Sequence, residues 1–176
     1  MTYKILRKQN ISSMCVVCGD KNELGIRTKF YECEKIDKKK DGENEKVLLA
    51  IFIPRDEHQS YPGMTHGGIT AAILDEAIGR AASILCPDIW GVTIDLSIKY
   101  RKPVPLNEKL YCETKITKMQ SRAFEGEGKL FKSDGTVLAT GWGKYMRLTP
   151  EKISEGGVTE ENWYYEDEDL PSEIVI

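Results

Sequence analysis

Two adjacent carboxylates stand in the most apolar segment of the chain, the run from Gly67 to Leu85 that is rich in Ala, Ile and Leu. Taking an ionised carboxylate out of water costs several kcal/mol unless it is paired or hydrogen-bonded. Glu76 has a base, Arg80, at the i,i+4 spacing that forms ion pairs on helices, so a purely structural salt bridge is one explanation for it. Asp75 has no base three or four positions away. The pattern therefore favours Asp75 as a general base or nucleophile.

Two glycines open the same segment, directly after His66. The first amides of a helix have no partner within the helix, so Gly67 and Gly68 are candidates to donate N–H groups to a developing oxyanion. His66 is a candidate to orient groups at this turn, although a lone histidine more often has a structural role.

The separation of these groups predicts an oligomer. Gly67 and Asp75 are eight residues apart, which is about 12 Å along a helix and too far for both to contact one carbonyl carbon. Two protomers with helices packed antiparallel about a two-fold axis bring Gly67 of one opposite Asp75 of the other. We expect an obligate homodimer with its active sites at the interface, and the sequence leaves open a further pairing into a dimer of dimers.

The segments around this helix predict strands. A helix that is apolar nearly all round must be wrapped by other structure, so the sequence predicts an α+β fold in which a curved antiparallel sheet surrounds one long central helix. Strict alternation in the strand from Gly91 places Thr93 on its polar face, with Asp95, Ser97 and Lys99. The expected strands are 25–34, 47–54, 91–101, 109–118, 122–132 and 136–148, the first two joined by the charged loop 35–45.

Composition predicts one folded domain. The chain has 176 residues, 40% of them hydrophobic, enough for one core. Its net charge of -3 combines an acidic end, nine acids and one base in the last 26 residues, with a body at +5. We divide the chain into a leader at 1–23, a folded domain at 24–149 and an acidic surface tail at 150–176. The bases of the body are dispersed and no nucleic-acid motif accompanies them, so we expect no nucleic-acid partner.

Cysteine usage and hydropathy indicate a compartment. Charges interrupt the most apolar run, and no basic head with an apolar stretch and cleavage site opens the chain, so we expect no secretion and no membrane partner. Five scattered cysteines fit a reducing compartment, and we expect the cytoplasm. Cys15-x-x-Cys18-Gly19 has the spacing of half a zinc knuckle, but no second pair of ligands has a suitable spacing, so the sequence predicts no metal site.

The segment from His66 to Ala77 resembles the signature of PaaI-type acyl-CoA thioesterases of the hotdog superfamily, in which an HGG turn precedes a catalytic acid nine residues after the histidine. Asp75 occupies that position. The stretch from Gly91 to Tyr100, followed by Pro103, is similar to the family's long central strand. The resemblance covers roughly residues 24–148, and some PaaI-like proteins share the Cys-x-x-Cys-Gly segment as well.

This resemblance implies a hotdog fold and hydrolysis of an acyl-CoA substrate to free acid and CoA without a cofactor. Asp75 would activate water or attack the thioester directly, while the Gly67 N–H polarises the carbonyl. Thr93 stands where relatives carry a hydroxyl that positions the water. Ser60 stands where some relatives have asparagine. Further candidate contacts to substrate are Gly68, Glu76 and, for the CoA phosphates, Lys99, Arg101 and Arg122, although a solvated surface charge is the simpler explanation for any one of these bases.

Two alternative functions use the same fold. A hotdog dehydratase acting on hydroxyacyl thioesters would need His66 and Glu76 to face each other across a dimer, but the HGG-to-Asp75 spacing favours hydrolysis. A non-catalytic acyl-CoA sensor would use the same cleft, but the residues before the first expected strand are too few for a DNA-binding output domain.

Overall fold

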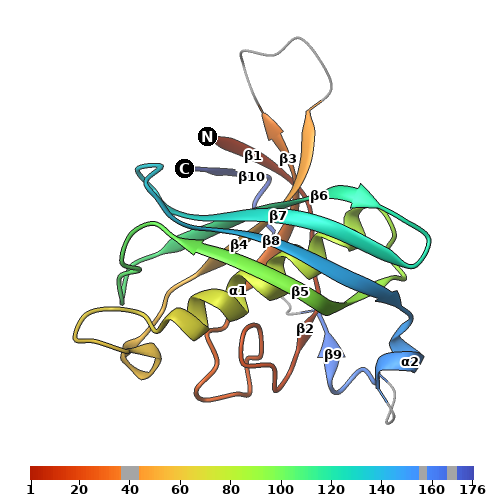
Figure 1. The fold of residues 1–176 in the computed structure, drawn as a ribbon, viewed down its shortest axis with the longest axis horizontal. Coiled ribbons are helices and arrows are strands. Elements are labelled where there is room, and N and C mark those ends of the chain that lie inside the picture. The colour runs from red at the N-terminus through yellow and green to blue at the C-terminus, as the bar shows by residue number, and fades with distance from the viewer. Residues whose placement is uncertain (37–43, 155–157, 166–169) are drawn as a thin grey trace.

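An antiparallel sheet of eight strands curves around helix α1 (Gly67–Arg80) in the computed structural model, which describes residues 1–36, 44–154, 158–165 and 170–176 (Figure 1). This arrangement is the hotdog fold, and the predicted α+β architecture is confirmed. The strands follow one another across the sheet in the order β10 (Glu173–Val175), β1 (Thr2–Lys8), β3 (Lys29–Ile36), β4 (Glu45–Phe52), β6 (Leu110–Met119), β7 (Ala123–Lys132), β8 (Val137–Leu148) and β5 (Trp90–Tyr100).

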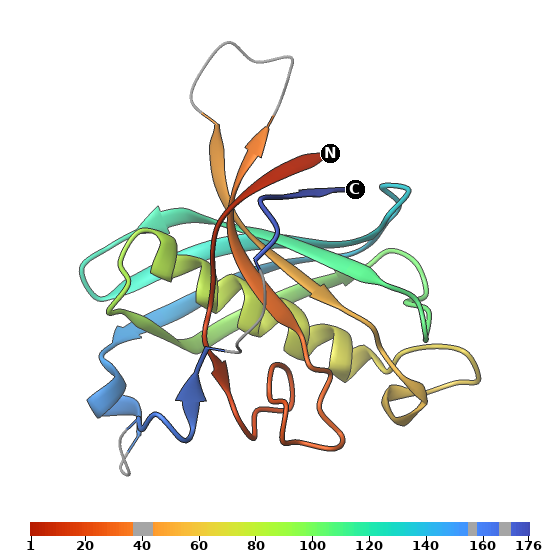
Figure 2. The same ribbon diagram turned by 180° about the vertical axis from the view of Figure 1, so that it is seen from behind.

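Short elements complete the described chain. A two-stranded ribbon of β2 (Ile11–Ser12) and β9 (Trp163–Tyr164) lies beside the helix, outside the main sheet (Figure 2). The other elements are the 3-10 turns η1 (Asp56–His58) and η2 (Ala81–Ile84) and the single-turn helix α2 (Pro150–Ile153). No helix among the described residues is both long enough and apolar enough to cross a membrane.

The central helix begins and ends where its sequence dictates. His66 is its N-cap, and the imidazole Nδ1 accepts a hydrogen bond from the Gly68 N–H at 2.9 Å. The α-helix ends at Arg80, and the last turn of the predicted helix is the tighter η2, before Pro87. Ile73, Leu74, Ala77 and Ile78 are fully buried against the sheet.

Glycines on the concave face of the sheet let the helix approach closely. A Cβ atom on Gly126 would lie 2.7 Å from Ile78 Cγ2 and 2.9 Å from the Lys115 carbonyl oxygen. On Gly128 it would lie 2.7 Å from Thr114 Cγ2 of strand β6 and 3.3 Å from Ile78 Cγ1 of the helix. Since real Cβ atoms do not pack this closely, the two glycines set the distance between α1 and strands β6 and β7.

The two segments predicted to lie outside the folded domain both join the sheet. Strand β1 of the expected leader pairs with β3, with Tyr3 fully buried. Strand β10 of the expected surface tail pairs with β1, and Figure 1 shows the two termini side by side. The boundaries at 24 and 149 therefore do not limit the sheet. The β1–β10 pairing joins residues 169 to 173 positions apart, and such pairing leaves no local signal in a sequence.

The long strand β5 contains a bulge that changes which side chains face the helix. Thr93 pairs with Tyr145 and Asp95 pairs with Lys144, so Ile94 is an extra residue in the ladder. Tyr145 is buried against the helix, and Thr93 therefore faces the helix too. The predicted placement of Thr93 on the outer, polar face with Asp95 and Ser97 is wrong, because uninterrupted alternation does not hold across a bulge.

The first two expected strands form the hairpin β3–β4, in which Lys35 pairs with Glu45. Residues 37–43 of the predicted charged loop lie outside the described residues, as do 155–157 and 166–169 of the tail.

The close helix–sheet approach can be tested by adding one methyl group. Gly126→Ala should lower the free energy of unfolding by about 1–3 kcal/mol, because its Cβ must displace Ile78 and the backbone of β6. Gly141→Ala on the same face is the matched control, since its Cβ meets nothing closer than 3.4 Å. Urea denaturation measures both, and equal stability of the two variants would contradict the predicted close packing at Gly126.

Candidate active site

Asp75 is half-buried where helix α1 meets strands β5 and β8. Its Oδ1 accepts a hydrogen bond from Thr93 Oγ1 at 2.9 Å. The Tyr145 hydroxyl lies 3.1 Å from the same oxygen and 3.0 Å from the Asp75 backbone carbonyl. Within the described chain Oδ2 has no hydrogen-bond partner, so one carboxylate oxygen is fixed and the other is left to act on a ligand.

Tyr145 was not predicted from the sequence. Burial, with the nearby Asp75 carboxylate, raises the pKa of its phenol, which therefore remains protonated and able to donate. Its ring stacks on Phe124 at a centroid distance of 5.1 Å. A tyrosine on the same strand face as Ala139, Gly141 and Gly143 is the signal that could have found it, because small neighbours leave room for the helix above it.

The bulge at Ile94 brings Thr93 to Asp75. A regular strand would turn the Thr93 hydroxyl to the outer face of the sheet, away from the helix. Bulges commonly redirect a side chain next to an active site. The bulge therefore brings the Thr93 hydroxyl to the Asp75 carboxylate, and the water-positioning role that the resemblance implies for Thr93 stays a prediction.

The glycine turn at the start of α1 supplies one free amide. The Gly68 N–H donates a hydrogen bond to His66 Nδ1, so the His66 imidazole caps the helix. Gly67 is the first helical residue, and its N–H has no hydrogen-bond partner among the residues described. Tyr100, another residue missed from the sequence, donates from its hydroxyl to the Gly67 carbonyl at 2.8 Å and ties the turn to β5.

Glu76 is engaged with other protein groups. Its Oε1 accepts from Arg80 Nε at 2.8 Å, so the i,i+4 ion pair predicted as the structural alternative is present. Its Oε2 lies 3.1 Å from Cys15 Sγ. The Arg80 guanidinium stacks on Phe30 and Trp163, with centroid distances of 4.6 and 4.9 Å. The two adjacent acids thus have different surroundings.

A cavity of about 570 Å³ opens beside the two acids. Asp75, Thr93 and Tyr145 form part of its wall, together with an aromatic pair, Trp90 and Trp163, whose ring centroids are 4.6 Å apart. These tryptophans come from β5 and from the predicted tail, so the tail helps to build the site. The cavity is large enough for an acyl group.

The other predicted residues are not gathered at Asp75. Ser60 is exposed in the turn before α1, where its Oγ accepts from the Tyr61 N–H. Lys99 and Arg101 line a separate cavity with Glu113 and Lys129, residues of the outer sheet face. Arg122 lies exposed in the β6–β7 turn. Their contact with CoA stays a prediction.

The sequence matches known thioesterases over the part of this site that contains Gly67, Asp75 and Thr93. The profile of the family described as Thioesterase superfamily matches residues 62–139, from before the glycine turn into β8. Acyl-coenzyme A thioesterase 13 of Homo sapiens is 30% identical over 99 residues, which are 54% of this chain and 69% of that protein. The chain belongs to the thioesterase superfamily.

Another sequence relative and a solved structure agree with this assignment to the superfamily. Acyl-coenzyme A thioesterase THEM4 of Xenopus laevis is 28% identical over 96 residues, 54% of this chain and 42% of that protein. The chain spans about half the length of the first curated relatives it matches. The crystal structure of the BH2602 protein from Bacillus halodurans with CoA superposes with a TM-score of 0.52 at 30% identity, covering 56% of this chain and 70% of that one.

Proposed function

We propose that the protein hydrolyses acyl-CoA thioesters in the manner of PaaI-type enzymes, with Asp75 as its catalytic carboxylate. The observation that carries the proposal is the Asp75 side chain itself, held at Oδ1 by Thr93 and Tyr145 and free at Oδ2 beside a cavity. The names of the sequence relatives and the CoA in a solved relative support the substrate class.

The chemistry follows from these positions. Asp75 Oδ2 takes a proton from water as the water oxygen bonds to the thioester carbon, and the carbonyl oxygen becomes an oxyanion. Collapse of that intermediate breaks the C–S bond and releases CoA thiolate. The thiolate then takes the proton from Asp75 Oδ2. The hydrogen bonds from Thr93 and Tyr145 to Oδ1 orient the carboxylate so that Oδ2 faces the reacting atoms. Direct attack by Oδ2, through an anhydride that water then hydrolyses, uses the same geometry.

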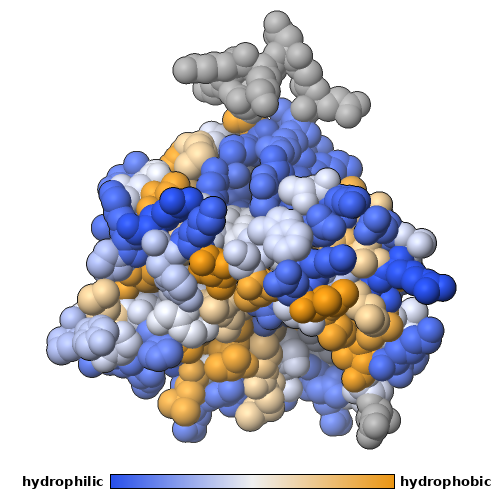
Figure 3. Space-filling model, in the orientation of Figure 1, coloured by the Kyte–Doolittle hydropathy of each residue, from blue (hydrophilic) through white to orange (hydrophobic). Residues whose placement is uncertain are grey.

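The oxyanion donor in this proposal is the Gly67 N–H of a second protomer. Asp75 and Gly67 of one chain are separated by two turns of α1. Strand β5 ends the sheet, and its open edge carries the exposed apolar side chains Val92 and Ile94, next to Met146 on β8. Apolar side chains gather over this part of the surface in Figure 3. Pairing of two such edges would bury them and bring the two α1 helices together.

The two alternative functions fit the geometry less well. A dehydratase would need His66 and Glu76 free to exchange protons, whereas His66 caps α1 and Glu76 is paired with Arg80. A sensor has no need of a carboxylate oriented by two hydroxyl donors. Hydration of an enoyl-CoA would indicate the dehydratase, and tight binding without turnover would indicate the sensor.

Replacing the carboxylate tests the proposal directly. Asp75→Asn should lower the release of free thiol from a panel of acyl-CoAs at least about a hundredfold, because an amide cannot accept the proton from water. Asp134→Asn is the matched control, since Asp134 lies in the exposed β7–β8 turn, where asparagine is equally suitable. Activity that survives in Asp75→Asn would overturn the assignment.

Removing the Gly67 N–H tests whether this amide is the oxyanion donor. Gly67→Pro keeps the helix, because proline suits the first helical position and His66 already has the extended conformation that proline requires (φ -61°, ψ 137°). It should lower activity about a hundredfold or more through the lost oxyanion donor, and far more than Gly67→Ala, which keeps the N–H.

Mixing the two inactive variants then shows whether Asp75 and Gly67 of one active site come from the same chain or from two chains. After joint refolding of Asp75→Asn with Gly67→Pro, each mixed dimer contains one intact site, so activity should return to about a quarter of the wild-type value. If both groups act within one chain, the mixture stays inactive.

A further inference from the structure

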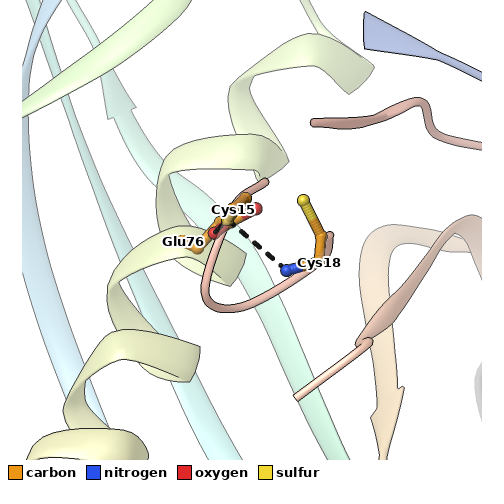
Figure 4. A group of neighbouring side chains, drawn as sticks. All are labelled: Cys15, Cys18 and Glu76. Carbon is orange, nitrogen blue, oxygen red and sulfur yellow. Dashed lines mark hydrogen bonds between the residues drawn. The ribbon is translucent and has the colours of Figure 1, made fainter. Parts of the chain in front are cut away.

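The Cys15–Cys18 turn, set aside in the sequence for want of further ligands, lies against helix α1 beside Glu76. We propose that Cys15, Cys18 and Glu76 bind a thiophilic divalent cation of the zinc class, which fastens the N-terminal loop to the central helix. The two sulfurs and a Glu76 carboxylate oxygen all lie within 4.8 Å of one another (Figure 4). Glu76 is 58 residues from Cys18 in the chain, which is why spacing alone could not reveal it.

The turn itself has the hydrogen bonds that support metal-bound sulfur. Cys15 Sγ accepts the N–H groups of Val17 at 3.3 Å and of Cys18 at 3.4 Å, and the Gly19 N–H returns to the Cys15 carbonyl at 2.9 Å. Figure 4 shows the two cysteines at either end of this one turn, with Cys15 against Glu76. Sulfur atoms in tetrahedral zinc sites are about 3.8 Å apart, so the ligands need to close by only about 1 Å.

Each proposed ligand also has an outer partner that leaves an atom free for the metal. Cys18 Sγ accepts from the Ser12 N–H at 3.4 Å and from Arg80 Nη2 at 3.1 Å. Arg80 Nε holds Glu76 Oε1, so Oε2 is directed at Cys15. Such second-shell contacts fix ligands in metal sites.

Charge balance favours a divalent ion. Two thiolates and one carboxylate carry three negative charges, and a divalent cation together with the largely buried Arg80 guanidinium carries three positive ones. Cys15 and Glu76 also line the 570 Å³ cavity, so water can supply a fourth ligand from that side. This site does not depend on the proposed hydrolysis, and no catalytic step passes through it.

Cobalt provides the test, because thiolate coordination gives Co²⁺ a charge-transfer band in the near ultraviolet and strong visible bands when four-coordinate. The full chain, reduced with a phosphine and stripped with a chelator, should develop these bands to saturation at one Co²⁺ per chain, and Zn²⁺ should remove them. Cys15→Ser and Cys18→Ser should each abolish the charge-transfer band, and Glu76→Gln should weaken binding at least about tenfold. Cys86→Ser, which removes a half-buried thiol outside the group, should leave titration unchanged.

A second measurement needs no variant. Saturating Zn²⁺ should raise the thermal midpoint of the wild type and slow the reaction of two thiols with a disulfide reagent. Absence of the cobalt bands, or equal bands in the Cys15→Ser/Cys18→Ser double variant, would overturn the proposal. A Cys15–Cys18 disulfide that forms as readily with Zn²⁺ as without it would also overturn the proposal. That result would identify the two cysteines as a redox pair.

Discussion

The candidate site depends on how the Asp75 carboxylate is held between Thr93 and Tyr145. Its Oδ1 accepts hydrogen bonds from both hydroxyl groups, and Oδ2 is left oriented toward the cavity. Three features of the sheet make this contact possible. Glycines on β7 and β8 let α1 lie close to the strands, the bulge at Ile94 turns Thr93 inward, and burial keeps the Tyr145 phenol protonated.

Asp75 and Glu76 differ in role because their side chains contact different groups. Glu76 meets a guanidinium and a thiol on the side of the helix that faces the N-terminal loop. Asp75, one helical step of about 100° away, meets only hydroxyl donors. Both oxygens of Glu76 therefore have protein partners, whereas Asp75 keeps Oδ2 free beside the cavity.

The sequence was sufficient wherever a local pattern decides the structure. The apolar run gives the central helix, and the absence of a base near Asp75 distinguishes it from Glu76 before any coordinates are known. Local patterns fail at Thr93, where an extra residue in the ladder reverses the alternation. Local patterns also miss the pairing of β1 and β10 and the contact between Glu76 and Cys15. These contacts join segments far apart in the sequence, which meet only once the sheet has closed around the helix.

The most direct test of the central contact is a double-mutant cycle on kcat/KM for hydrolysis of a single acyl-CoA, with Thr93→Val and Asp75→Asn. If Thr93 acts by orienting the Asp75 carboxylate, Thr93→Val lowers kcat/KM about ten- to a hundredfold in the wild type and has no further effect when Asp75 is already asparagine. Independent, multiplying losses from the two substitutions would contradict the account.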